Sequence, residues 1–336
     1  MPARLKDIAN DLNLSVVTIS KVLRDHPDIS QETRERVRKR MKELNYRPNL
    51  TARALVTGRS YIAGLVVPDL VHPFFGQVAR GLSSELRKKG YCLVLSSSED
   101  DAELEKQEIE LLLARRVDLM IVASVQNTMD SFHRLAELKV PYILIDRKID
   151  GLAANFVGVD DEAVGVLATS HLIDAGCRRI AFIGGPHVST ALGRRDGYLR
   201  ALAERGLTTE RELLEVPEHS GDPRDASGYC AMQRLLALER RPDGVFCFND
   251  PTAMGAMKAV LEAGLRVPED IAIAGCGNGA YSDFLRVPLT SVDQQSGAIG
   301  EHTARMALSL LENGAAARPI TTLLEPQLVV RASTQR

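Results

Sequence analysis

Four small residues in the last quarter of the chain stand at a spacing that can bind a phosphate. Gly275, Gly277, Gly279 and Ala280 fit the G-x-G-x-x-G/A turn of dinucleotide sites, and the apolar run before them could be its strand. Such a turn normally opens a long helix in a βαβ unit. Pro288 follows too soon for a crossover helix. The pattern therefore predicts a glycine-rich loop at the rim of a site, and a nucleotide site is disfavoured.

Other side chains that could bind a ligand follow apolar runs typical of β-strands. Carboxylates, amides and a guanidinium beside an aromatic ring suit a polyhydroxylated small molecule. Ligands of parallel sheets bind beyond the carboxyl ends of the strands, where these side chains are expected. The candidate effector-binding residues are Phe74, Asp146, Asp160, Arg194, Asn249 and Gln294.

Enzyme chemistry has no comparable support. The chain lacks G-x-S-x-G, H-E-x-x-H and a Walker A lysine, and its seven histidines are scattered. Its five cysteines include no C-x-x-C pair, which argues against a zinc site or a disulfide framework. We expect no enzyme activity, no catalytic residue, no cofactor and no metal.

The elements that must position these side chains alternate in type from residue 61 onward. Eight apolar runs, from IAGLVVP at 62 to IAIAGCG at 271, are separated by amphipathic stretches at 76–89, 102–115, 161–175, 194–205, 225–240 and 252–264. This alternation predicts an α/β fold with parallel sheets covered on both faces. The length suits two doubly wound lobes, with a ligand between them.

Charge is distributed unevenly along the 336 residues. Residues 1–60 carry 13 Lys and Arg against 7 Asp and Glu, whereas the remainder carries 29 against 37. A basic head on an acidic body indicates that the head binds a polyanion. The chain shows no secretory signal and no apolar run of membrane length, so we expect a cytoplasmic protein.

The head reads as three short helices. Leu5, Ile8, Ala9 and Leu12 form one apolar face, and Ser15 can cap a second helix after the interruption at 13–15. This arrangement predicts a helix-turn-helix whose second helix enters the major groove of DNA. Lys21 can donate to guanine, Val16 and Val17 can contact thymine methyl groups, and Thr18 and Ser20 can bind phosphate. A third helix from a Ser30 cap carries a row of outward basic residues.

The order of these motifs resembles the lactose-repressor (LacI/GalR) family of bacterial transcription regulators. The segments LKDIAND, NLS, VVTISKVLRD, SQETRERV, LNYRPN, ARALVTGRS and YIAGLVVPD carry the resemblance, which extends from about Leu5 to Ala332. It implies a small all-α helix-turn-helix head and a bilobed effector domain of the periplasmic-binding-protein type. Recognition of double-stranded DNA is implied for Leu5, Ser15, Val16, Val17, Thr18, Ser20, Lys21, Arg24 and Thr33, and for Asn49, Ala52 and Leu55 of a hinge helix, with Leu55 wedging open a base step.

The resemblance also implies a domain plan. The head covers 1–47, the hinge and linker 48–60, and the bilobed body 61–336. Lobe one takes about 61–160 plus 293–318, and lobe two about 161–290 plus 319–336. A homodimer on a pseudo-palindromic operator is implied, with operator binding controlled by an effector.

One departure bears on the effector. The family commonly has Gly-Phe-Asp-Asp where this chain has Gly275, Cys276, Gly277 and Asn278, so the usual pocket aspartate is absent. A sugar, a sugar acid or a sugar phosphate all fit the remaining residues. The alternatives are a bilobed solute-binding protein, or a co-repressor-dependent regulator of a non-sugar metabolite. The operator sequence, the sign of the effector response, and repression against activation are left open.

Overall fold

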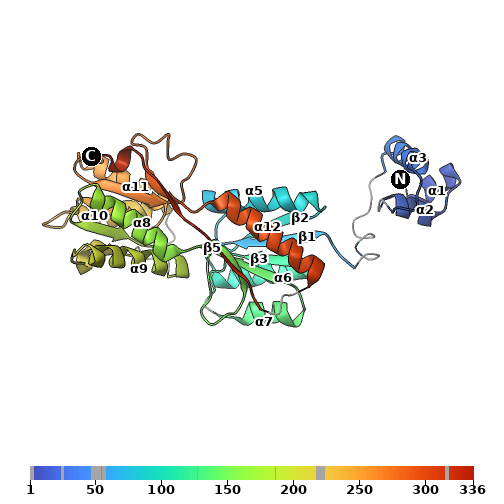
Figure 1. Cartoon of the computed structure of the whole chain (residues 1–336), viewed down its shortest axis with the longest axis horizontal. Helices are drawn as coiled ribbons and strands as arrows, with labels where there is room; N and C mark the ends of the chain where they lie inside the picture. Colours follow the sequence, from blue (N-terminus) through green and yellow to red (C-terminus); the bar gives the residue numbers. More distant parts are fainter. Residues whose placement is uncertain are drawn as a thin grey trace. The chain divides into compact units, whose positions relative to one another are not determined.

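The computed structural model describes residues 4–23, 26–46, 54, 58–126, 128–185, 187–216, 224–314 and 318–336. The chain separates into two compact units, residues 1–60 and 61–336. We call them the head and the body and describe each by itself (Figure 1).

The head consists of α1 (Leu5–Leu12), α2 (Val16–Leu23) and α3 (Gln31–Glu43) around a small core. Asn13 ends α1 in the left-handed conformation, with φ 53°, and turns the chain toward α2. Ser15 then caps α2, because its Oγ accepts the Thr18 N–H at 3.0 Å. Ile8, Ala9, Ile19, Val22 and Val37 are buried together. The predicted helix-turn-helix is confirmed.

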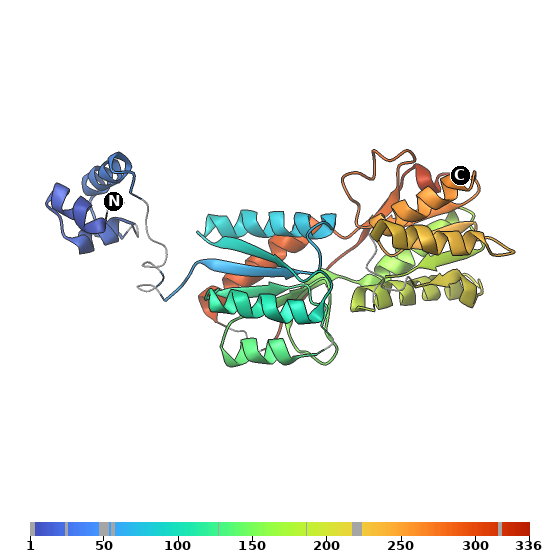
Figure 2. The ribbon, with the colours of Figure 1, turned by 180° about the vertical axis from the view of Figure 1, so that it is seen from behind.

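The body contains two six-stranded sheets. The first has the order β11-β5-β4-β3-β1-β2 and defines the first lobe. Its strands are β1 (Ile62–Val67), β2 (Cys92–Ser97), β3 (Leu119–Val122), β4 (Tyr142–Ile145), β5 (Asn155–Val159) and β11 (Thr321–Leu324). Figures 1 and 2 show one face covered by α5 (Pro73–Lys88) and α12 (Ser296–Asn313), and the other by α6 (Ala102–Ala114) and α7 (Asp130–Glu137).

The second sheet defines the second lobe and has the order β12-β10-β9-β8-β6-β7. Its strands are β6 (Ile180–Ile183), β7 (Leu214–Glu215), β8 (Gly244–Cys247), β9 (Ala272–Cys276), β10 (Thr290–Asp293) and β12 (Gln327–Val329). The covering helices are α8 (Asp161–Asp174), α9 (Ser189–Glu204), α10 (Arg224–Leu236) and α11 (Asp250–Glu262); short 3-10 turns lie at Arg211–Leu213 and Ala332–Thr334.

Strand alternation divides the second lobe into two cores. Ile180 and Phe182 of β6 join one buried cluster with α8 and α9, whereas Ala181 and Ile183 join another with α10 and α11. The strand pairs are parallel apart from β10 with β12, which is antiparallel. The predicted doubly wound α/β body is confirmed, with this antiparallel edge as an addition.

The chain crosses between the sheets three times. The crossings follow β5, β10 and β11, because each of these strands is succeeded by an element of the other lobe. The predicted lobe boundary was wrong at the third crossing: residues 321–324 pair in parallel with β5 and belong to lobe one, not lobe two. The apolar run 321–324 is too short to show from sequence which sheet it joins. The helices α7 and α12 were also absent from the predicted helical stretches.

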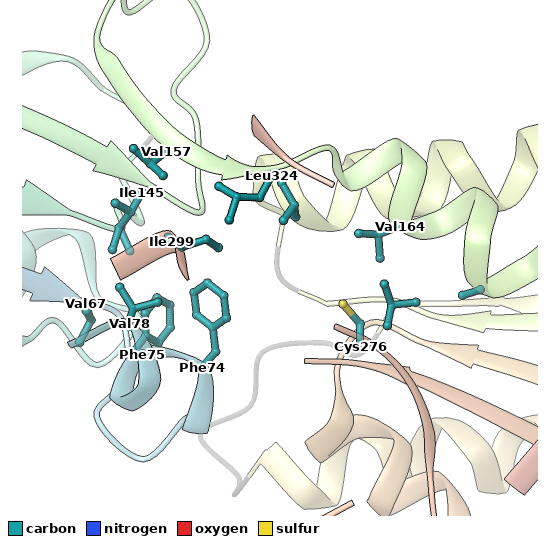
Figure 3. Close-up of a cluster of buried hydrophobic side chains, with 14 of the residues drawn as sticks. Val67, Phe74, Phe75, Val78, Ile145, Val157, Val164, Cys276, Ile299 and Leu324 are labelled. Atoms are coloured by element: carbon teal, nitrogen blue, oxygen red, sulfur yellow. The ribbon is translucent and has the colours of Figure 1, made fainter. Parts of the chain in front are cut away.

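A buried apolar cluster contains residues of both lobes. Val67, Phe75, Val78 and Ile145 lie on the first-lobe side, and Val164 and Cys276 on the second (Figure 3). Phe74 lies at the side of the first-lobe group that faces Val164 and Cys276 (Figure 3). No helix in the part of the chain described is both long and apolar enough to span a membrane.

Candidate functional site

The outer face of α2 is suited to contacting base edges in a DNA groove. Val16 and Val17 are 42% and 63% exposed, although both are apolar, because Ile19 and Val22 occupy the inner face of the helix. Exposed valines next to a lysine offer a methyl surface and a cation on one helix, which are the groups that recognise thymine and guanine.

Lys21 forms an ion pair within the head. Its Nζ donates to Asp28 Oδ2 at 2.6 Å, and His26 contacts the other oxygen of the same carboxylate. The pair is partly exposed, so breaking it costs little. Lys21 must leave or share this carboxylate before it can donate to a base.

The remaining predicted DNA-contacting residues have mixed roles. Thr18 Oγ1 bonds the Ser15 hydroxyl at 2.9 Å, and the Thr33 N–H donates to Ser30 Oγ at 3.3 Å, so both take part in helix caps. Leu5 packs at the margin of the head core, and Ser20 is partly exposed. Arg24, Asn49, Ala52 and Leu55 lie outside the described residues.

The basic face of α3 is less free than the sequence suggests. Arg40 pairs with Asp11 at 2.7 Å and Glu43 at 2.9 Å. Arg34 donates to the backbone carbonyls of His26 and Ile29. These two arginines tie the head together, while Arg36, Lys39 and Lys42 remain exposed for a polyanion.

In the body, Arg194 of α9 is the centre of a buried polar group. It is 3% exposed, and its Nε and Nη2 each lie 3.0 Å from Asp161 Oδ1. Its Nη1 donates to the Phe248 carbonyl at 2.8 Å, and the guanidinium carbon lies 4.8 Å from that ring's centroid. This geometry fixes a full positive charge away from water, which requires negative partners.

A glycine brings these partners together. A Cβ at Gly165 of α8 would lie 2.2 Å from the Arg194 carbonyl oxygen, so only glycine lets α8 and α9 approach so closely. The start of α8 therefore sits against Arg194.

The carboxylate that meets Arg194 is Asp161, which directly follows the predicted candidate Asp160, and a role of Asp160 in effector binding stays a prediction. Asp160 is exposed and caps α8, with Oδ1 accepting the Ala163 N–H at 3.1 Å. The sequence offers two adjacent aspartates, and only the helical phase beginning at the cap shows which one turns inward.

Asp146 contributes a second buried acid. It follows β4 with φ 61°, a left-handed conformation that few non-glycine residues adopt. Burial raises the pKa of its carboxyl, and the charges of Arg147 and Arg194 oppose this shift. Its Oδ2 lies 3.8 Å from Arg147 Nε.

Two buried donors lie close to the Asp146 carboxylate. They are Arg147 Nε and Gln294 Nε2, on residues that are 7% and 4% exposed. Both are directed at the Asp146 carboxylate, so this site holds a buried acid together with hydrogen-bond donors.

Asn249 joins the two lobes. Its Oδ1 accepts the Thr252 N–H at 2.9 Å as the cap of α11, so its Nδ2 is the atom that lies 3.3 Å from His72 Nε2. His72 Nδ1 in turn accepts the Phe74 N–H at 3.3 Å. A neutral imidazole cannot accept at both nitrogens, so only one of these two contacts is a hydrogen bond accepted by His72. A second link between the lobes runs from the Lys148 N–H to Ser189 Oγ, at 2.8 Å.

Phe74 is 4% exposed and meets Phe75 edge to face, with centroids 5.0 Å apart. Asp146, Asp161, Arg194, Asn249, Gln294 and His72 form what we call the interlobe site. Phe74 borders it from the first lobe.

The glycine-rich loop has no nucleotide geometry. Gly277 has φ 128°, and residues 277–289 form turns that lead directly to β10 without a helix. The buried Asp250 carboxylate holds this loop, accepting from Gly279 N at 2.8 Å and Ser291 Oγ at 2.6 Å. Among the described residues, no group of His, Cys, Asp or Glu side chains is arranged to hold a metal.

Known proteins share both units. Residues 4–49 match the family of bacterial regulatory proteins called lacI, and residues 169–334 match a periplasmic binding protein-like domain. The HTH-type transcriptional repressor PurR of Mannheimia succiniciproducens is 32% identical over 99% of both chains, and that of Pasteurella multocida is equally similar. This chain belongs to the LacI family.

Solved structures agree with this assignment. A lac repressor dimer bound to operator and the anti-inducer ONPF is 28% identical, with TM-score 0.88 over the full length of both chains. A complex of the transcriptional regulator CelR with cellobiose is also 28% identical, with TM-score 0.74 over 98% of this chain and 99% of the other. This LacI-family protein is accordingly a DNA-binding transcriptional repressor, and its relatives are repressors, not enzymes.

Sequence reasoning missed four residues of the body sites as binding or positioning candidates. They are His72, Arg147, Asp161 and Asp250. Asp161 and Asp250 each stand beside a residue that was chosen. An aspartate immediately after a predicted cap is the signal that could have found the last two.

The titration of Asp161 should make the free energy of unfolding depend on pH. Burial raises the pKa of Asp161 to about 7, although Arg194 opposes this shift. An unfolded aspartate titrates at about pH 3.9. Between these values the folded chain keeps a proton that the unfolded chain loses, so the free energy of unfolding falls as pH rises through this window.

We expect Asp161→Asn to flatten this dependence. The difference in unfolding free energy between pH 5 and pH 8 should shrink by roughly 2–4 kcal/mol, measured by denaturant titration. Asp160→Asn, next in sequence but exposed, is the matched control and should leave the slope unchanged. An equal slope in wild type and Asp161→Asn would show that Asp161 stays ionised throughout.

Proposed function

We propose that this repressor binds a pseudo-palindromic operator as a homodimer, and that a small carbohydrate-like effector at the interlobe site controls this binding. The observation that carries the effector proposal is the group of buried donors, on Arg147 and Gln294, beside the buried Asp146 carboxylate. A polyhydroxylated molecule supplies acceptors for such donors and hydroxyl donors for the carboxylate. The relative solved with cellobiose supports this ligand class.

Charge bears on the choice between neutral sugars and sugar acids. Gly277 stands where the family usually has an aspartate, which favours an acid. However, Arg194 is already paired with Asp161, so its charge is not free to attract an anion. A neutral sugar is therefore the leading effector class, and a sugar acid is favoured only where Asp161 takes up a proton.

The three crossings between the lobes are the connection through which an effector would control DNA binding. A ligand that binds Asp146 and Gln294 together with Arg194 and Asn249 contacts both lobes and stabilises one relation between them. Operator binding then changes if the head is competent in only one of these states. The hinge residues that would transmit the change, Asn49, Ala52 and Leu55, keep the roles implied by the family.

The first experiment is selection of binding sites from a random duplex library with the full-length protein. Enrichment of a twofold-symmetric sequence supports the regulator and the dimer. Binding that is salt-sensitive but not sequence-selective would contradict both, unless a pool of sugars, sugar acids and purine bases restores selectivity. The same compounds are then tested one by one by thermal shift. Stabilisation by purine bases alone would overturn the carbohydrate proposal.

Exposed apolar side chains support the dimer. Phe284 and Val71 are each 87% exposed, so their apolar side chains are available to a partner surface. We expect Phe284→Ser to weaken the dimer at least about tenfold, since a buried interface aromatic contributes 1–3 kcal/mol or more. Sedimentation equilibrium measures the change. Leu138→Ser, at a residue 49% exposed, is the control. Equal dimer strength in both variants would place the interface elsewhere.

A further inference from the structure

Asn278 occupies a junction between the rim of the interlobe site and the crossings. It follows Gly277 with φ 47° and makes three polar contacts. Its Nδ2 donates to Asp293 Oδ2 at 3.1 Å, its Oδ1 accepts from Arg331 Nη2 at 2.8 Å, and its N–H donates to Ser291 Oγ at 2.9 Å. The side chain thus bridges β10 and the segment after β12.

The contacts continue into two of the three crossings. Asp293 Oδ1 accepts the Gln295 N–H at 2.6 Å at the second crossing. Gln295, itself left-handed with φ 55°, donates its Nε2 to the Glu325 carbonyl at 2.7 Å at the third crossing. A continuous hydrogen-bonded chain therefore runs from Arg331 through Asn278, Asp293 and Gln295 to Glu325.

An amide is the side chain that this junction requires. It donates to a carboxylate on one side and accepts from a guanidinium on the other. An aspartate, the residue the family pattern commonly has here, would still accept from Arg331 but would place a carboxylate against Asp293. Asparagine and aspartate both tolerate the left-handed backbone, so the difference between them lies in the side chain.

We propose that Asn278 is the positioning residue that couples the effector-site rim to the second and third crossings. A ligand that shifts the 277–279 loop displaces Asn278 and with it Asp293, so pocket occupancy changes the path of the crossings that set the relation of the lobes. Gln294, a buried residue of the interlobe site that hydrogen-bonds Asp146, lies between Asp293 and Gln295 on this path. The inference deepens the proposed function, and its test needs neither operator nor effector.

The test is hydrogen–deuterium exchange of the full-length protein without ligand. Asn278→Asp should speed exchange about tenfold both at the rim, 277–283, and at the crossings, 293–296 and 325–331. The exchanged pair Asn278→Asp with Asp293→Asn restores a donor facing a carboxylate and should return both regions to within about twofold of wild type.

Asn313→Asp is the matched control. It makes the same chemical change at an exposed amide at the end of α12, whose Nδ2 donates to the Ser309 hydroxyl of the same helix, and should leave all three regions unchanged. Faster exchange confined to 277–283 would overturn the coupling, and so would failure of the double variant to restore the crossings. A protein without a selectable operator could still show the expected pattern, so the two proposals fail separately.

Discussion

Replacing Arg194 with alanine should lower the free energy of unfolding of the body by about 3–5 kcal/mol, because it leaves a buried carboxylate without its ion partner. Asp161 loses both contacts of 3.0 Å, and the Phe248 carbonyl loses its donor. The loss of unfolding free energy should be larger at pH 8 than at pH 5, because protonation of Asp161 at the lower pH removes its unpaired negative charge. Denaturant titration at both pH values measures it.

The same variant should abolish the thermal shift produced by whichever sugar stabilises the wild type. Arg195→Ala is the control, because Arg195 is the next residue on α9 and pairs only with the exposed Asp196. A stable Arg194→Ala protein that still responds to the sugar would place the effector away from the interlobe site.

Lys21→Ala should weaken operator binding about 10- to 100-fold and relax discrimination at one base position, which is the effect of losing a base contact. Asp28→Asn should act in the opposite direction, tightening binding up to about fivefold, because it frees Lys21 from a partly exposed ion pair. Fluorescence anisotropy at one fixed salt concentration compares the selected operator with a scrambled duplex.

The two outcomes together identify the role of Lys21. If Lys21→Ala weakens both duplexes equally, the residue contacts phosphate and reads no base. If Asp28→Asn also weakens binding, the ion pair orients Lys21 and does not compete with DNA. Lys89→Ala, an exposed lysine of the body paired with Glu312, controls for loss of charge.

Local patterns predicted the elements well. The Ser15 and Ser30 caps, the apolar stripe through Ile19 and Val22, and the strand–helix alternation each depend on neighbours within one or two helical turns. The structure places Asn249 and Gln294 directly after strands β8 and β10, and Arg194 within α9, and their roles in effector binding stay predictions.

Features set by distant segments could not be predicted in this way. The choice between Asp160 and Asp161 depends on the close approach of α8 and α9, which Gly165 permits. The sheet joined by residues 321–324 depends on a free edge at β5, more than 150 residues earlier in the chain. The neutralisation of Arg40 by Asp11 likewise joins helices that are separate in sequence.

The pairing of β11 with β5 also bears on how the protein is made. The first sheet lacks its edge strand until residue 324 has been synthesised, and α12, which covers α5, ends only at Asn313. The amino-terminal lobe therefore waits for nearly the whole chain to leave the ribosome, with the apolar side chains of α5 uncovered meanwhile. The second lobe needs still later residues, because its own edge strand is β12 at Gln327–Val329, so neither lobe is complete before the last part of the chain is made.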